Sequence, residues 1–280
     1  MRSGAGGLML PPPGSRVKTD FPYWLVAAAL IAVAAAIYIA NDNLYAQVFS
    51  TVATGIWITL FVTVVAFALA SALGLGIALM GISGSKFLSQ IARFYVEIIR
   101  GVPILVLLFW IAFAGVPALV AGWNALTAPL QEAGWLPALQ VRDMSLLWRA
   151  IIALMIGYSA FIAEVFRAGI QAVDRGQIEA AKALGLKRGQ RFRLIVLPQA
   201  LRTILPPLGN DFIAMVKDSS LVSVLGVGDI TQMGKIYAAG SFRFFETYSI
   251  VAYIYLILTV SLSLALRGLE QRLRRQHSEQ

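Results

Sequence analysis

Long stretches without a charged side chain alternate with short polar segments along the chain. Residues 21–41, 43–85, 101–131 and 247–266 contain no Asp, Glu, Lys or Arg. A bilayer core about 30 Å thick is crossed by a helix of about 20 apolar residues. The pattern therefore predicts an all-α integral membrane protein with about six transmembrane helices, near residues 24–40, 52–80, 101–121, 146–168, 199–222 and 248–267.

The first apolar run has a second interpretation, as a secretory signal peptide, because Arg16 and Lys18 precede it. The run is long and lies far from the N-terminus, so we expect a retained transmembrane helix.

Basic side chains collect in alternate connecting segments. Of the 23 Lys and Arg residues, 17 lie in the N-terminal arm, in segments 81–100 and 167–193, and in the tail from residue 267. The intervening segments hold three, or four if Arg149 is counted. Because cytoplasmic segments of membrane proteins are enriched in Lys and Arg, both termini are predicted to be cytoplasmic. This topology also explains the net charge of +9, so it gives no support for a nucleic-acid partner.

The composition excludes several kinds of chemistry. Hydrophobic residues make up 59% of the chain and charged residues 13%, which argues against a soluble or a disordered protein. There is no cysteine and one histidine, His277, so thiol catalysis and multi-histidine metal sites are excluded. No G-x-x-x-x-G-K-[ST] phosphate-binding sequence is present. We expect no catalytic residue, metal or cofactor on this chain.

The segment 173–198 reads as a short helix with its own start and stop signals. Asp174 is a favourable N-cap, and Gln177 has the spacing of a capping box. Gly185 is a favourable C-terminal stop, which predicts a helix from about Arg175 to Leu184. Ile178, Ala181 and Leu184 would share one face. Such a helix suits insertion into a groove of a partner protein; an amphipathic helix lying on an anionic membrane surface is the alternative.

The same segment carries a recognisable signature, EAA followed by three residues, Gly, nine residues and I-x-L-P. It resembles the EAA motif of permease subunits of ABC transporters at every position: Glu179, Ala180, Ala181, Gly185, Ile195, Leu197 and Pro198. The resemblance implies a type I ABC importer permease fold, in which this helix is the coupling helix that docks on an ATP-hydrolysing subunit. ATP and Mg would then be bound by that partner, and this chain would not be an enzyme by itself. Further implied partners are a second permease subunit, an extracytoplasmic binding protein and the lipid bilayer.

Four other stretches are similar to the polar amino-acid uptake subfamily, whose members carry histidine, glutamine, arginine or glutamate: 95–103, 161–169, 205–213 and 217–221. The resemblance implies a multi-pass permease of the bacterial (inner) membrane. It divides the chain into a cytoplasmic arm, an extra N-terminal transmembrane helix with a short outer loop, the permease domain and a cytoplasmic tail, at residues 1–23, 24–45, 46–270 and 271–280.

Charged side chains within a predicted span indicate a candidate substrate site, because a charge at the membrane centre costs at least about 2.5 kcal/mol. Asp211 and Asp218 lie seven residues apart, and hence on one face of a helix. Together with Asn210 and Lys217 they are the candidate contacts for the ammonium group, the carboxylate or a basic side chain of an amino acid. The alternative is a structural network in which Lys217 neutralises Asp218.

The sequence predicts two further features of the spans. Pro206, Pro207 and Gly209 are predicted to break the helix of span 199–222. Glu164 and Arg167, spaced as i and i+3, are expected to form a structural ion pair.

Two other classes of function compete with an ATP-driven importer. A secondary transporter or channel would need no ATPase, but no internal repeat of the kind found in many such proteins is evident. A membrane enzyme would need a nucleophile or metal ligands beside the two carboxylates.

Overall fold

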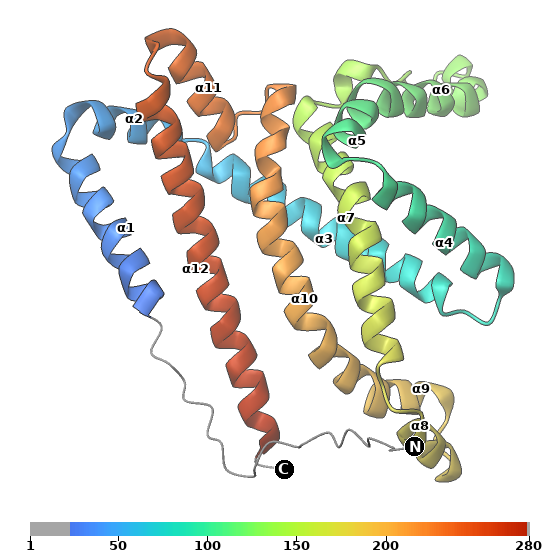
Figure 1. Cartoon of the computed structure of the whole chain (residues 1–280). Helices are drawn as coiled ribbons and strands as arrows, with labels where there is room; N and C mark the ends of the chain where they lie inside the picture. The colour runs from blue at the N-terminus through green and yellow to red at the C-terminus, as the bar shows by residue number, and fades with distance from the viewer. Residues whose placement is uncertain (1–22, 279–280) are drawn as a thin grey trace, which may run out of the picture.

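Three long helices stand side by side and form the body of the molecule. The computed structural model describes residues 23–278, which form helices and no strand. Helices α7 (Leu146–Gln171), α10 (Leu197–Asp218) and α12 (Phe244–Ser278) run nearly upright in Figure 1, and α3 (Ile56–Gly81) crosses behind them.

Further helices lie at the two ends of this body. Helices α8 (Arg175–Ala183) and α9 (Arg188–Arg191) lie at one end, named here the α8 end. Helices α2 (Asn43–Ala53), α6 (Val116–Glu132) and α11 (Ile230–Ser241) lie at the other, named the α11 end. The short outer loop expected at the end of segment 24–45 is partly helical, because α2 begins at Asn43. Asp42 caps this helix, since its carboxylate accepts hydrogen bonds from two backbone N–H groups.

The bounds predicted for the third span are wrong. Segment 81–100, expected to be a loop, forms most of helix α4 (Lys86–Gly101), which begins at Ser85 through a hydroxyl cap. The chain then leaves the helix at Val102 and Pro103, and α5 begins at Ile104. From there one continuous apolar helix extends through a π-helical turn and α6 to Glu132. The missing N–H of proline and its restriction of the preceding residue explain why the backbone breaks here.

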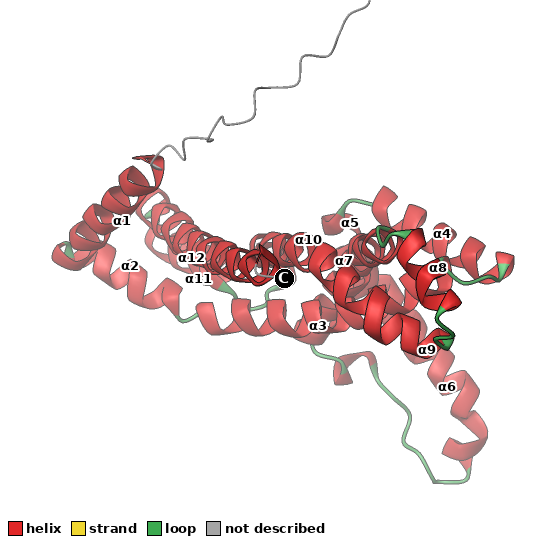
Figure 2. Ribbon diagram, turned by 90° about the horizontal axis from the view of Figure 1, so that it is seen from below, coloured by secondary structure: helices red, strands yellow, loops and turns green. Residues whose placement is uncertain are grey.

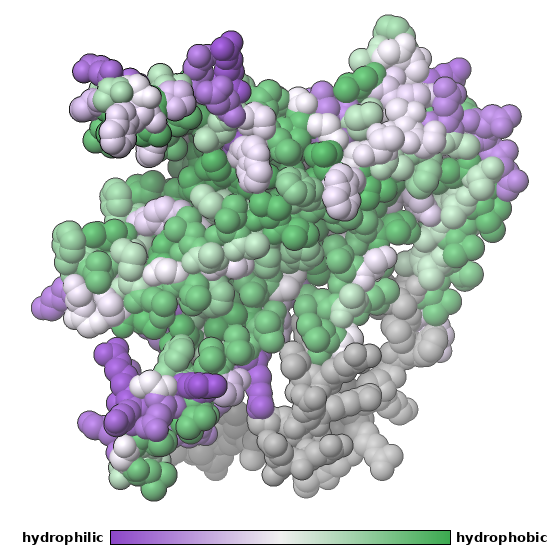
Figure 3. Space-filling model, turned by 180° about the vertical axis from the view of Figure 1, so that it is seen from behind, coloured by the Kyte–Doolittle hydropathy of each residue, from purple (hydrophilic) through white to green (hydrophobic). Residues whose placement is uncertain are grey.

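Four helices in the described part of the chain are long and apolar enough to cross a membrane: Asn43–Gly81, Ile104–Glu132, Leu146–Gln171 and Phe244–Leu269. The first predicted span corresponds to α1 (Tyr23–Asn41), whose apolar part is shorter, and the fifth corresponds to α10, which carries charges. A broad hydrophobic band lies between hydrophilic ends on the face seen in Figure 3. Seen along the bundle, α1 lies at one edge and α6 toward the opposite one (Figure 2). The predicted all-α membrane fold is confirmed; residues 1–22 of the predicted arm and 279–280 of the predicted tail lie outside the described residues.

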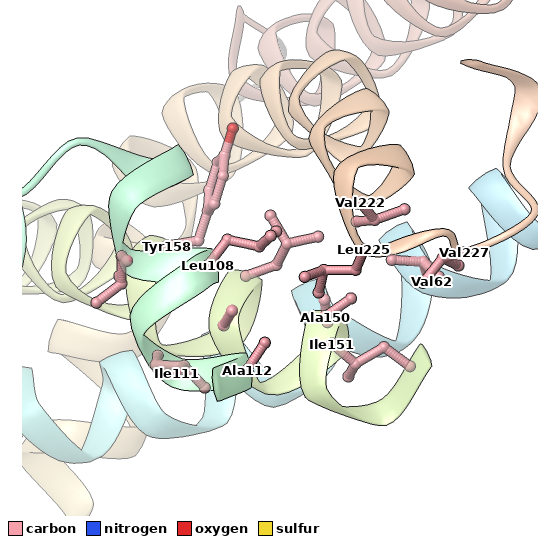
Figure 4. Packing of buried hydrophobic residues seen from close by; sticks show 14 of the residues in the cluster. Val62, Leu108, Ile111, Ala112, Ala150, Ile151, Tyr158, Val222, Leu225 and Val227 are labelled. Atoms are coloured by element: carbon pink, nitrogen blue, oxygen red, sulfur yellow. The ribbon is translucent and has the colours of Figure 1, made fainter. Parts of the chain in front are cut away.

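The main core joins α3, α5 and α7. Figure 4 shows side chains from these helices and from the 3-10 turn after α10 meeting in one cluster. Helices α3 and α7 approach closely at Gly74 of α3, where an added Cβ would lie 2.9 Å from the carbonyl oxygen of Ser159 in α7. A glycine at this point lets the two backbones touch, as is common between membrane helices.

The predicted break in α10 is wrong. The helix continues from Leu197 to Asp218 with Pro206 and Pro207 inside it, which membrane helices tolerate when neighbouring groups satisfy the freed carbonyls. Gly209 instead lets α10 pack closely against α12, because a Cβ at this position would lie 2.3 Å from the side chain of Leu266 in α12. The helix break in this region lies instead between α4 and α5, at Val102 and Pro103.

Candidate functional site

Helix α8 starts at a side-chain cap. The carboxylate of Asp174 accepts a hydrogen bond from the N–H of Gly176, as predicted. The expected capping box is not formed, because Gln177 accepts a hydrogen bond of 2.6 Å from the side-chain amide of Gln199 in α10. This bond ties the first turn of α8 to the base of α10.

The other end of α8 is closed by a Schellman motif. Gly185 has a φ of +77° and its N–H donates to the carbonyl of Lys182, while the N–H of Leu186 donates to the carbonyl of Ala181. Glycine takes this left-handed conformation without a steric penalty. The predicted helix and its stop are confirmed, with the last helical residue at Ala183.

One face of α8 packs against the body and the other is open. Ile178 packs against the apolar base of α7 and α10, and Ala181 is buried. Glu179 and Ala180 are exposed. Leu184 was predicted to share one face with Ile178 and Ala181, and this prediction is wrong. Leu184 is 81% exposed, because the chain leaves the helix at that residue. An exposed surface with small and apolar side chains is thus presented away from the body.

The second half of the signature lies on the helix that connects α8 to α10. Residues Phe192–Val196, including Ile195, form a π-helical turn, and the N–H of Leu197 donates to the carbonyl of Phe192. Pro198 follows as the second residue of α10. A widened turn relieves the clash between a proline ring and the preceding turn, so the helix continues through Pro198.

The candidate substrate residue Asp218 is held by a partner from another helix. The hydroxyl of Tyr158 in α7 donates to its carboxylate at 2.8 Å. In Figure 4 the Tyr158 hydroxyl points away from the other labelled core side chains. Lys217 is exposed, and no ion pair joins it to Asp218 in the described structure. The partner of Asp218 is therefore the hydroxyl of Tyr158, and no local sequence pattern links these two residues, which lie on different helices.

Asp211 lies two turns before Asp218 on α10. One of its carboxylate oxygens is buried and has no hydrogen-bond partner among the described residues. Asn210 beside it is exposed. An unsatisfied buried carboxylate oxygen is costly, so this position retains capacity to bind a donor.

The expected pair of Glu164 and Arg167 is formed. The Nε of Arg167 lies 3.0 Å from a carboxylate oxygen of Glu164, near the α8 end of α7.

A second polar cluster, at the α11 end, was not expected from the sequence. Asp229 is fully buried and caps α11, and the hydroxyl of Tyr255 in α12 donates to its carboxylate at 3.1 Å. The N–H of Ile230 donates to the hydroxyl of Thr59 in α3. The cluster joins α3, α11 and α12, three helices that no local pattern brings together.

The helical membrane body and the capped helix α8, one face of which is exposed, can be compared with known protein families. Residues 70–275 match the family described as "Binding-protein-dependent transport system inner membrane component". The chain belongs to this family. The match includes α8, α10 and α12 and leaves α1 and α2 outside it.

Among relatives of this family member, the probable amino-acid permease protein YxeN of Bacillus subtilis (strain 168) is 38% identical over 216 residues, which cover 77% of this chain and 88% of that protein. The glutamine transport system permease protein GlnP of Escherichia coli (strain K12) is 36% identical over 220 residues, 79% of this chain and 91% of that protein.

Solved structures agree with the fold. A chain from the crystal structure of an amino acid ABC transporter with histidines has a TM-score of 0.66 and 38% identity, covering 81% of this chain and 95% of that one. A chain of the MetNI methionine ABC transporter in an inward-facing conformation has a TM-score of 0.60 at 21% identity, covering 79% and 95%. The fold is therefore that of a type I ABC importer permease.

Proposed function

We propose that this chain is the translocation subunit of an ATP-driven importer of polar or charged amino acids. The observation that carries the proposal is the capped helix α8, whose open face bears Glu179 and Ala180 and whose other face is fixed to α7 and α10. The relatives' names, which include amino-acid and glutamine permeases, support the substrate class.

In this proposal α8 is the coupling helix. ATPase subunits bind its open face, and ATP and Mg are bound and turned over on those subunits. Because Gln177 and Gln199 link α8 to α10 directly, a displacement of α8 moves the base of α10. Rigid-body movement of this kind alternates access to a site in the membrane.

The substrate site in this proposal lies on the face of α10 that meets α7. Asp218, held by Tyr158, and Asp211, with its unsatisfied oxygen, attract a cationic group of the substrate, either its ammonium group or a basic side chain. Asn210 and Lys217 lie next to them on the exposed side.

The orientation and the remaining partners also belong to the proposal. The α8 end faces the cytoplasm of a bacterial cell with the chain in the inner membrane, both termini are cytoplasmic, and the α11 end faces an extracytoplasmic binding protein. A second permease subunit, identical or related, completes the pore. The clustering of Lys and Arg supports this orientation.

Co-purification tests the coupling role. We expect an ATPase subunit to co-purify with the wild-type chain and to be lost from a variant carrying Glu179→Arg and Gly185→Pro, because the open face and the helix stop are both destroyed. An Arg243→Gln variant at the α11 end is the control and should retain the ATPase. Retention of both ATPase binding and uptake by the double variant would reject the proposal.

Substitution of Asp218 tests the substrate site. Asp218→Asn removes the charge and should reduce uptake about tenfold or more, since a hydrogen bond to a charged group is worth about 1.5–3 kcal/mol. Tyr158→Phe keeps the charge and removes the donor at 2.8 Å, so a smaller loss is expected. Normal uptake of amino acids by both variants would reject the role of this pair.

A further inference from the structure

Helices α4 and α5 together follow α7 from one end of the body to the other. At the end of α3, a Cβ added at Gly81 would lie 3.9 Å from the side chain of Arg167, near the α8 end of α7. After α4 and α5, the carbonyl of Ala112 accepts a hydrogen bond of 3.1 Å from Arg149, in the first turn of α7. These two points of α7 are about 27 Å apart along a helix, close to the thickness of a bilayer core. The chain has therefore crossed the membrane once by Ala112.

Helix α6 follows this crossing and stays at the α11 end. Because α3 ends at the α8 end and α7 starts at the α11 end, a second crossing by α6 would leave α7 starting at the wrong end. Figures 1 and 2 agree that α6 lies across the direction of the upright helices and extends away from the body. Its 17 residues thus run along the surface at which the crossing ends.

The faces of α6 differ in chemistry. One face, named here the α6 stripe, consists of four exposed apolar side chains: Leu119, Trp123, Leu126 and Leu130. A second face is polar and turned to the loop after the helix, where Asn124 accepts from the N–H of Leu139 at 2.9 Å and donates to its carbonyl at 2.8 Å. The polar groups are thus satisfied within the protein, and the large apolar side chains are left uncovered.

The α6 stripe faces the part of the body that lies within the membrane. Its side chains Leu119, Trp123 and Leu126 line a cavity of about 540 Å³ together with Ile152 and Ile156 of α7. Both isoleucines follow the first turn of α7 in the direction of the α8 end. No charged side chain of the described residues lines this cavity. The groove between α6 and α7 is therefore an apolar space that opens at the level of the crossing helices.

Tryptophans mark the same level. Five of the six tryptophans of the chain lie in segments that meet at the α11 end, namely the first turns of α3 and α7, the end of α5, α6 and the loop after it. All five are exposed: Trp57, Trp148, Trp110, Trp123 and Trp135. Tryptophan is enriched where a membrane protein passes from hydrocarbon to headgroups. The boundary of the bilayer at this end therefore lies near α6.

We propose that α6 is an interfacial helix that lies in the plane of the bilayer surface, with the α6 stripe in the lipid and an acyl chain in the groove beside α7. Lipid is the occupant because the exposed face is uncharged, faces the membrane level and is accompanied by tryptophans, as in helices that bind membrane surfaces. Hydropathy counts Ile104–Glu132 as one possible span; here α5 ends a crossing and α6 lies on the membrane. This inference goes beyond the proposed function, since it does not depend on what is transported.

Spin labels on the full-length permease in phosphatidylcholine nanodiscs test this proposal. Because the chain has no cysteine, each label needs one substitution, and the chosen positions are exposed. Collisions with oxygen report lipid, and collisions with a water-soluble nickel complex report solvent. Leu119→Cys and Leu130→Cys, about 16 Å apart along the helix axis, should give the same shallow depth. Leu126→Cys should collide several-fold more with oxygen than with nickel. Ala121→Cys, on the opposite face of α6, is the matched control and should show the reverse.

Three results would overturn the interfacial helix. Depths of Leu119→Cys and Leu130→Cys that differ by most of their separation would mean that α6 crosses the bilayer. More nickel than oxygen collisions at Leu126→Cys would mean that the α6 stripe lies in water. A label at Leu126→Cys that neither reagent reaches would mean that protein covers the stripe, either a second copy or an extracytoplasmic partner. None of these results bears on whether an ATPase binds α8, so the two proposals fail separately.

Discussion

Asp229 is the buried acid that holds the α11 end together. Its carboxylate accepts hydrogen bonds from the N–H groups of Thr231 and Gln232 and from the hydroxyl of Tyr255. Burial raises the pKa of the Asp229 carboxyl, and the hydrogen bonds offset only part of this effect. The folded protein therefore binds a proton at this site more readily than the unfolded chain does.

The raised pKa gives a pH-dependent prediction for Asp229→Asn. An amide cannot accept all three donors, so the variant should lose about 1–2 kcal/mol of stability. A folded-state pKa above the unfolded value means that the wild-type contribution is largest below the unfolded pKa and declines as pH rises through the folded pKa. The difference in melting temperature between wild type and variant should shrink from acidic to neutral pH. A difference that grows with pH would contradict this assignment.

At the scale of the element, the stop of α8 depends on one glycine. Gly185 has a φ of +77°, where a Cβ costs about 1 kcal/mol. Gly185→Ala should weaken association with the ATPase about fivefold, in line with that cost. Gly189→Ala, in α9 with open space around the added Cβ, is the matched control. If the two variants retain the ATPase equally in a pull-down, the C-terminal cap of α8 at Gly185 is not required for ATPase binding.

The crossing of α3 and α7 gives a second matched pair of glycines. A Cβ at Gly74 would lie 2.9 Å from the Ser159 carbonyl oxygen, whereas one at Gly76 meets nothing within 4 Å. Gly74→Ala should destabilise the protein by about 1–3 kcal/mol, and Gly76→Ala should be neutral or slightly stabilising. Thermal unfolding in detergent compares them directly. Equal melting temperatures would mean that the two helices separate without cost.

Some elements were predictable because their signals are local. The caps at Asp174 and Gly185 lie within one turn of the residues that they serve, so the sequence predicts α8 closely. Hydropathy predicts that a helix crosses the membrane, but gives poor bounds where an amphipathic helix such as α4 adjoins an apolar one. The effect of Pro206 and Gly209 depends on what α10 packs against, and the partners Tyr158 and Thr59 come from distant segments. These features require the tertiary structure.

At the scale of the whole molecule, α8 and α11 lie at opposite ends of the long helices of the body (Figure 1). Helix α8 is fixed to the bases of α7 and α10, while Asp229 and Thr59 fix α11 to α12 and α3. In the proposed function, movement at the α8 end is transmitted along α10, past Asp211 and Asp218, to the far end. The central claim is that a partner ATPase acts on α8 from the cytoplasm.

Site-specific labelling of Ala180 tests that claim most directly, because the chain has no cysteine and Ala180 is exposed. A membrane-impermeant maleimide should label Ala180→Cys in inside-out vesicles and not in intact spheroplasts, and bound ATPase should protect it. Ala239→Cys on α11, also exposed, should show the opposite sidedness. Labelling of Ala180→Cys in intact spheroplasts, or labelling that ATPase binding does not slow, would contradict the account.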